Sequence, residues 1–295
     1  MATPGDLAKR LWVAAVGLPV VIACLWFGGW ALGVLVTIGG VIGIHEFCAI
    51  SNCRGARPFS FVAVVAVAAL ILATTARPQI DTLVYGGFWL LLGLTLLLSG
   101  AAVWLRPPTT TEHGAVSSTL FGVAYVGLPL ALIPILRALP AQLGVVSADT
   151  PMELASFVVM PLAVMWVGDS TAYFVGSAIG KTRLAPAVSP HKSVEGAVAG
   201  LVGSIAAAAV VAYLGPAHWP TSPISISTSL WMGALIGTAG QVGDLVESAL
   251  KREAGVKDSG SLLPGHGGVL DRLDALLFAM PMTWLALVLA GIVSF

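Results

Sequence analysis

Four side chains near the end of one apolar stretch have the types and the spacing that could hold a metal ion against a phosphate. Asp244, Glu247, Ser248 and Lys251 stand at positions i, i+3, i+4 and i+7, so a helix would carry all four on one face. A carboxylate inside an apolar stretch is costly to bury unless it is paired, so we expect this face to line a polar cavity. The alternative is a structural stripe in which Asp244, Ser248 and Lys251 only bond one another.

A glycine-rich loop over residues 257–268 follows that stretch and could supply donors for an anion. Glycine adopts positive φ without strain, so the backbone N–H groups of Gly267 and Gly268 could point toward one anion. Lys257 at the start of the loop adds a positive charge. This composition is too polar for lipid and favours a phosphate-binding turn.

The next apolar stretch opens with two more carboxylates, Asp271 and Asp274, which share a helix face at i and i+3. Two carboxylates that face Asp244 across a cavity suit Mg²⁺, an ion that prefers a few carboxylates together with waters and phosphate oxygens. The alternative for Asp271 alone is a charged cap at the helix start. Taken with the loop, these residues predict a metal–phosphate site.

A second polar segment lies earlier in the chain. Asp169 and Tyr173 share a helix face, and Lys181, Arg183 and Lys192 lie in the loop that follows. The basic residues would either line the same site or form an ordinary basic loop of the kind that flanks membrane helices.

One isolated carboxylate, Glu46, lies in an apolar stretch of the N-terminal half. The pair His45-Glu46 is not a zinc-protease motif, because Ala49 stands where the second histidine should be. Glu46 is therefore either a paired structural charge or a member of the rim of the site.

The composition places these few polar residues in a membrane protein. The 295 residues include only 14 basic and 14 acidic ones, 9% in all against about 25% in soluble domains. The apolar set is 57% and the mean hydropathy is +0.95, more apolar surface than a water-soluble fold could hide. A soluble enzyme, a disordered chain and a nucleic-acid binder are therefore excluded.

Several apolar stretches are long enough to cross a bilayer, and lipid requires each of them to be helical. There are nine, at residues 11–28, 30–51, 59–76, 82–105, 118–139, 154–178, 193–215, 227–250 and 273–294. With a cytoplasmic N-terminus, twelve of the 14 basic residues fall on the cytoplasmic side. The predicted fold is an all-α, polytopic integral membrane protein with about nine transmembrane helices and a cytoplasmic N-terminus.

The charges are spread unevenly along the chain, with fifteen of them between Asp169 and Asp274. We expect residues 1–150 to form a transmembrane region of about five helices that supplies a scaffold and dimer contacts. Residues 151–295 would form a catalytic region of about four helices with a cytoplasm-facing polar site. Gly-x-x-x-Gly pairs at Gly176/Gly180 and Gly196/Gly200 would let neighbouring helices approach closely.

The longest polar segment carries a recognisable pattern: Ser248-Ala-Leu-Lys251-Arg252-Glu-Ala-Gly-Val-Lys257-Asp258-Ser-Gly260-Ser-Leu-Leu263-Pro264-Gly-His266-Gly267-Gly268-Val269-Leu-Asp271-Arg272-Leu273-Asp274. It resembles the 27-residue signature of phosphatidate cytidylyltransferases, also called CDP-diacylglycerol synthases, at every fixed position. Further segments resemble the family: Gly168-Asp169-Ser170, Leu184-Ala-Pro186, Ser189-Pro190 and Lys192-Ser193-Val-Glu195-Gly196. One difference is Ser193, where many members carry threonine. The resemblance covers roughly residues 160–275.

The resemblance implies a reaction in which CTP and phosphatidate give CDP-diacylglycerol and pyrophosphate. It also implies dependence on Mg²⁺, a location in the inner membrane and a homodimer. The family's metal ligands carry over onto Asp244 and Asp271, with Glu247 and Asp274 as outer ligands and a second, monovalent cation such as K⁺ nearby.

The remaining site residues are assigned by charge and donor type. The residues expected to neutralise pyrophosphate or hold phosphatidate are Lys251, Arg252, Lys257 and Arg272. The residues expected to bind substrate are Asp169, Tyr173, Lys181, Ser189, Lys192, Ser193, Ser248, Asp258, His266, Gly267 and Gly268. Two alternatives remain: a CTP-dependent lipid or polyprenol kinase, and a cation-coupled transporter whose buried acids bind the ion.

Overall fold

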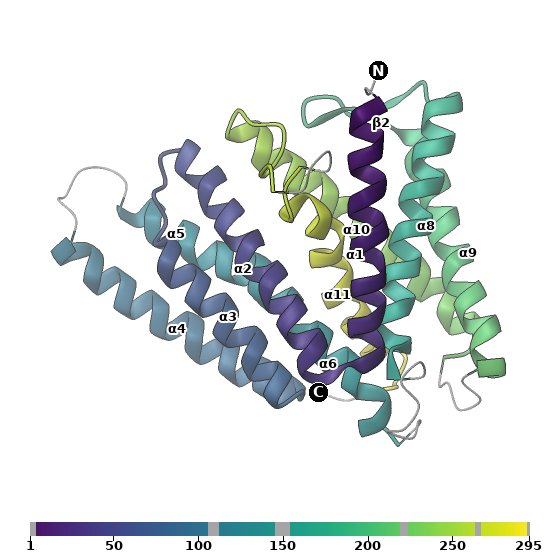
Figure 1. The fold of residues 1–295 in the computed structure, drawn as a ribbon, viewed down its shortest axis with the longest axis horizontal. Helices are drawn as coiled ribbons and strands as arrows, with labels where there is room; N and C mark the ends of the chain where they lie inside the picture. Colours follow the sequence, from purple (N-terminus) through teal and green to yellow (C-terminus); the bar gives the residue numbers. More distant parts are fainter. Residues whose placement is uncertain (1–3, 106–111, 145–153, 219–223, 263–266, 294–295) are drawn as a thin grey trace. The chain divides into compact units, whose positions relative to one another are not determined.

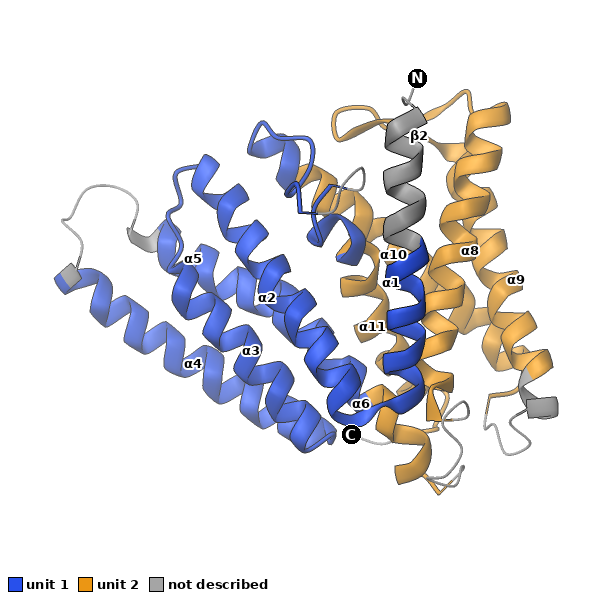
Figure 2. Cartoon of the chain, viewed as in Figure 1, with its two compact units in different colours: residues 1–135, 250–273 blue, residues 136–249, 274–295 orange. Residues whose placement is uncertain are grey.

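The computed structural model describes residues 4–105, 112–144, 154–218, 224–262 and 267–293, and the chain separates into two compact units (Figures 1 and 2). Unit 1 comprises residues 1–135 and 250–273, and unit 2 comprises residues 136–249 and 274–295. These boundaries differ from a division at residue 150, because the first part of unit 1 ends at residue 135 and one late segment, residues 250–273, belongs with the N-terminal helices. The division into a scaffold and a catalytic region stays a prediction.

Unit 1 is built from the N-terminal helices (Figure 2). In order they are α1 (Pro4–Phe27), α2 (Gly29–Cys53), α3 (Ser60–Ala76), α4 (Ile80–Leu105), α5 (Glu112–Gly122), the single π-helical turn η1 (Val123–Gly127) and the first half of α6 (Leu128–Gln142). The turn from α1 to α2 is tight because Gly28 and Gly29 adopt φ of 61° and 49°, which side chains with a Cβ rarely tolerate.

Unit 2 holds the second half of α6 and the later helices. These are α8 (Ser156–Ile179), α9 (Val194–His218), most of α10 (Ile226–Glu253) and most of α11 (Leu270–Leu289). Between α8 and α9 lies an antiparallel hairpin of β1 (Arg183–Ala185) and β2 (Ser189–Ser193), in which Arg183 pairs with Ser193 and Ala185 with Ser189. The all-α expectation did not include this hairpin, although every long element of the described chain is helical.

All nine predicted apolar stretches coincide with helix in the described chain. By length and composition, six described helices could cross a membrane: Gly29–Cys53, Ile80–Trp104, Gly114–Gln142, Ser156–Ile179, Val194–Leu214 and Leu270–Leu289. The apolar helices at Ala15–Phe27 and Ser60–Ala76 are shorter, and α10 is more polar because its last three turns carry the charged face. The chain is therefore an α-helical membrane protein.

Small residues bring α8 and α9 together, as the Gly-x-x-x-Gly spacing predicted (Figure 1). A Cβ on Gly176 would lie 3.4 Å from Gly196 Cα, and one on Gly196 would lie 2.8 Å from the Ala172 carbonyl oxygen. A Cβ on Gly200 would lie 3.0 Å from the Gly168 carbonyl oxygen. The distances at Gly196 and Gly200 are tighter than a Cβ normally makes, so the prediction of close helix approach is confirmed.

Gly196→Ala is therefore expected to lower the thermal unfolding midpoint in detergent, because the added methyl group must displace the backbone of α8. Such overpacking costs about 1–3 kcal/mol, more than the roughly 1 kcal/mol that alanine gains over glycine inside a helix. Gly39→Ala is the matched control, since a Cβ there meets nothing within 4 Å. An equal or higher midpoint for Gly196→Ala than for Gly39→Ala would contradict the packing.

Candidate active site

Asp271 begins α11 with both carboxylate oxygens bonded inside unit 1. Lys251 Nζ lies 2.6 Å from Oδ1, while the backbone N–H groups of Ser259 and Gly268 donate to Oδ2 at 3.0 and 2.8 Å. The side chains of Lys251 and Asp271 are only 11% and 6% exposed. Water cannot easily screen this ion pair, so its geometry is strongly constrained.

The glycine turn before α11 is shaped around the Asp271 carboxylate. Gly267 has φ of 79°, and a Cβ there would lie 2.6 Å from Asp271 Oδ2 and 3.5 Å from Asp258 Cβ. The next N–H, that of Gly268, donates to the same oxygen. The turn thus presents a backbone donor to the chain's own Asp271 carboxylate, while the phosphate-binding role expected from the loop composition stays a prediction.

Two residues outside the predicted site residues, Ser259 and Glu46, also bond to this group. Ser259 Oγ donates to the Glu46 carboxylate at 3.0 Å and accepts from the Asp271 N–H at 3.3 Å. Ser259 lies inside the polar loop and could have been suspected from its hydroxyl. The contact with Glu46 joins residues 213 positions apart, and no local pattern reveals it.

Asp244 forms the corresponding group in unit 2. Its Oδ2 lies 2.5 Å from Lys192 Nζ, with the two side chains 34% and 29% exposed. Ser248, one turn later on α10, donates to Oδ1 at 3.5 Å, a long hydrogen bond. The structure thus brings three predicted site residues together, one from β2 and two from α10.

The hairpin that carries Lys192 is tied to the start of α9. Ser193 Oγ accepts from the Gly196 N–H at 3.1 Å, which makes it an N-cap for α9. Glu195 accepts from the N–H groups of Lys181 and Thr182 at 3.2 Å and from Thr182 Oγ1 at 3.0 Å. These bonds tie the residues just before β1 to the start of α9 and cap α9 directly after β2, so they restrain the hairpin that carries Lys192.

The other predicted site residues differ in their exposure. Seven are exposed: Asp169, Tyr173, Lys181, Arg252, Lys257, Asp258 and Arg272. Ser189 is half-buried in β2, and Asp274 accepts from the Ala275 N–H at 2.7 Å. Glu247 is fully buried. His266 lies outside the described residues.

The donor chemistry of Asp244 and Asp271 fits a cation. Each carboxylate is already in contact with a lysine ammonium, so each position favours positive charge. The described residues hold no group of three or more His, Cys, Asp or Glu side chains that could bind a metal by themselves. A magnesium ion at either aspartate would take its other ligands from water and phosphate, which is the coordination that Mg²⁺ prefers.

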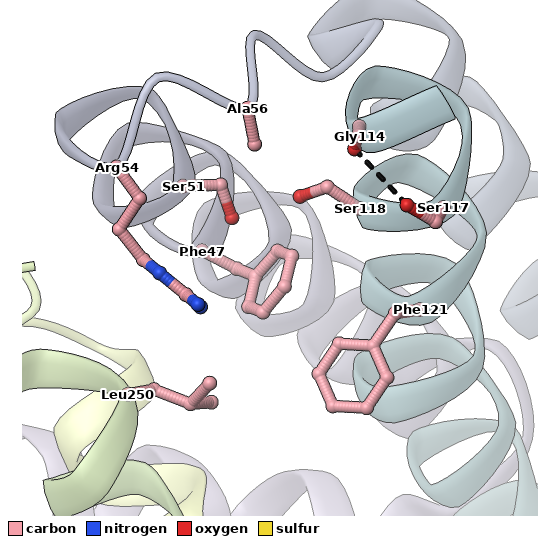
Figure 3. Close-up of a pocket in the computed structure, with 9 residues that line it drawn as sticks. All are labelled: Phe47, Ser51, Arg54, Ala56, Gly114, Ser117, Ser118, Phe121 and Leu250. Carbon is pink, nitrogen blue, oxygen red and sulfur yellow. Dashed lines mark hydrogen bonds between the residues drawn. The ribbon is translucent and has the colours of Figure 1, made fainter. Parts of the chain in front are cut away.

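A cavity of about 420 Å³ opens in unit 1 (Figure 3). It is lined by Phe47, Ser51, Arg54, Ala56, Gly114, Ser117, Ser118, Phe121 and Leu250. The rings of Phe47 and Phe121, 5.7 Å apart, and the three serine hydroxyls give it a mixed lining. Arg54 bonds Glu253 at 2.6 Å. No predicted site residue lines this cavity.

The chain is similar to known proteins over almost its whole length. The model of the family described as "Cytidylyltransferase family" matches residues 8–290. A phosphatidate cytidylyltransferase from Synechocystis sp. is 29% identical over 95% of this chain and 96% of its own length. The enzyme of that name from Bacillus subtilis is 43% identical over 45% of this chain and 48% of its own, and one from Brucella abortus is 36% identical over 66% and 65%.

Proposed function

The chain belongs to the cytidylyltransferase family, and from that premise we propose that it is a phosphatidate cytidylyltransferase. It transfers the cytidylyl group of CTP to phosphatidate and gives CDP-diacylglycerol and pyrophosphate, a step of phospholipid biosynthesis. The observation that carries this proposal is the similarity to the Synechocystis enzyme of that name, which extends over 95% of the chain.

The reaction needs positioning and charge neutralisation more than a protein nucleophile. A phosphate oxygen of phosphatidate attacks the α-phosphorus of CTP, and the bond from that phosphorus to the bridging oxygen breaks as pyrophosphate leaves. Because the nucleophile is already an anion, no strong base is required, and catalysis comes from holding the anions together and stabilising the leaving group. The positive charge comes from Lys251, Arg252, Lys257 and Arg272. The residues that bind substrate include Asp169, Tyr173, Lys181 and Ser189.

Asp244 and Asp271 would hold Mg²⁺, with Glu247 and Asp274 as outer ligands and a monovalent cation such as K⁺ nearby. The ion would supply charge neutralisation on the CTP phosphates. Support for this comes from the ammonium cation that each of the two aspartates already contacts. Lys192 and Lys251 hold the carboxylates in fixed orientations.

We also propose nine transmembrane helices, a cytoplasmic N-terminus and a location in the bacterial inner membrane as a homodimer. The support is the count of twelve basic residues out of 14 on one side of that topology. The active site then faces the cytoplasm, from which CTP arrives, while phosphatidate enters from the bilayer.

The test is to incubate the purified protein in liposomes with phosphatidate and CTP labelled at either the α- or the γ-phosphate. We expect Mg²⁺-dependent transfer of the α-label to lipid and release of the γ-label as pyrophosphate. Transfer of the γ-label to lipid would identify a CTP-dependent kinase instead. Absence of any CTP-dependent product, with ion flux across the liposome membrane, would favour a transporter.

A further inference from the structure

Glu46 lies in α2 and caps the start of α11, which is far from it in sequence. Its carboxylate accepts from the Val269 N–H at 3.1 Å and from the Leu270 N–H at 2.8 Å. It also accepts from Ser259 Oγ at 3.0 Å. The first N–H groups of a helix have no partner within the helix, and a carboxylate there satisfies them and favours the helix dipole.

The loop backbone is fitted closely around this carboxylate. Glu46 is 6% exposed, and a Cβ on Gly260 or Gly268 would overlap its carboxylate oxygens. Positions 260 and 268 therefore leave no room for a Cβ beside the Glu46 carboxylate. All three hydrogen bonds to Glu46 come from neutral groups, so within these contacts Glu46 is not the paired charge that the sequence allowed.

The hydroxyl of Ser259 links the Glu46 carboxylate to Asp271. Ser259 donates its O–H to Glu46, accepts from the Asp271 N–H, and donates its own backbone N–H to Asp271 Oδ2. Gly268, packed against Glu46, donates to that oxygen as well. The position of the Glu46 carboxylate therefore determines where both donors to Asp271 Oδ2 stand.

We propose that Glu46 is a positioning residue for the active site: it caps α11 from α2 and thereby fixes the Asp271 carboxylate. The proposal rests on the proposed function in so far as Asp271 takes part in cytidylyl transfer. It gives the N-terminal helices a direct part in the site. In this role Glu46 acts through its bonds to Ser259, Val269 and Leu270.

The experiment compares Glu46→Gln with Glu253→Gln in the full-length protein. Both changes remove one carboxylate from unit 1, but Glu253 is 54% exposed and forms an ion pair with Arg54, which is itself 44% exposed. Glutamine at position 46 replaces one acceptor oxygen with an NH₂ group that cannot accept from an N–H. We expect amide hydrogen exchange over residues 267–273 to become at least about tenfold faster in Glu46→Gln only.

Kinetics then separate positioning from simple stability. We expect kcat per folded protein to fall about tenfold or more in Glu46→Gln, with the KM for CTP nearly unchanged, because orientation of Asp271 is lost rather than a substrate contact. Ser259→Ala should have a similar effect, and the double variant should lose little beyond either single change, since both act on one chain of contacts.

Each outcome decides one claim. Unchanged exchange over residues 267–273 would refute the cap. Faster exchange with normal kcat would refute the positioning role and leave a structural cap. The exchange measurement needs no turnover, so failure of the wild-type protein to make CDP-diacylglycerol would overturn the proposed function without deciding whether Glu46 caps α11.

Discussion

Asp244→Asn is expected to lower kcat by about a hundred- to a thousandfold, which is the scale of removing one charge-stabilising group from an active site. The Asp244–Lys192 pair is about one-third exposed, and pairs of this kind contribute only about 0–1 kcal/mol to folding. The variant should therefore fold normally and lose turnover alone. The measurement is the rate of CDP-diacylglycerol formation in liposomes over a range of Mg²⁺ concentrations, with the unfolding midpoint recorded in parallel.

Asp81→Asn is the matched control for Asp244→Asn. It makes the same chemical change at an exposed aspartate in the first turn of α4, remote in sequence from both polar segments. We expect it to retain wild-type turnover. Near-normal activity in Asp244→Asn would remove Asp244 from the site.

Asp271→Asn is expected to abolish Mg²⁺-dependent turnover to at least the same extent, but with a structural component. Its carboxylate bonds Lys251 and two backbone N–H groups while nearly buried. Asparagine keeps one acceptor oxygen and leaves the buried ammonium of Lys251 without its charge partner, a loss that costs about 3–5 kcal/mol in buried pairs. We expect a lower unfolding midpoint together with the loss of product formation.

A second variant separates these two effects. Lys251→Gln combined with Asp271→Asn removes both charges of the pair, so no buried ammonium faces an uncharged side chain at position 271 and part of the stability should return. Turnover should stay absent. Recovery of activity in the double variant would show that Asp271 serves the fold and that neither residue of the pair is needed for cytidylyl transfer.

The helices could be predicted from sequence because hydropathy over some twenty residues is a strong signal, and all nine stretches coincide with helix. The hairpin was missed because β1 and β2 are only 3 and 5 residues long, and Ser189-Pro190-His191 has no alternation of apolar and polar residues. Their pairing is held by Glu195 and Ser193 at the start of α9, which local patterns do not show.

Some contacts of the candidate site could likewise be predicted from sequence, and others could not. The spacing of Asp244 and Ser248 predicted a shared helix face, and their bond confirms it. The pairing of Lys251 with Asp271 could be suspected only from their charges, because the sequence does not predict the path of the loop that connects them. Glu46 could not be assigned a role, since a carboxylate in an apolar helix indicates that a polar partner exists but not which segment supplies it.

The cap that α2 places on α11 bears on how this protein could be engineered. The residues of the signature segment are consecutive in the sequence, which suggests a self-contained unit. Here the N–H groups at the start of α11 donate to the Glu46 carboxylate of α2, more than two hundred positions earlier in the chain. Transplanting residues 248–274 into another helical host would therefore transfer the motif without the acceptor that orders it. A functional chimaera would need to carry α2 along with the graft, or another acidic side chain placed where it can accept from the first N–H groups of α11.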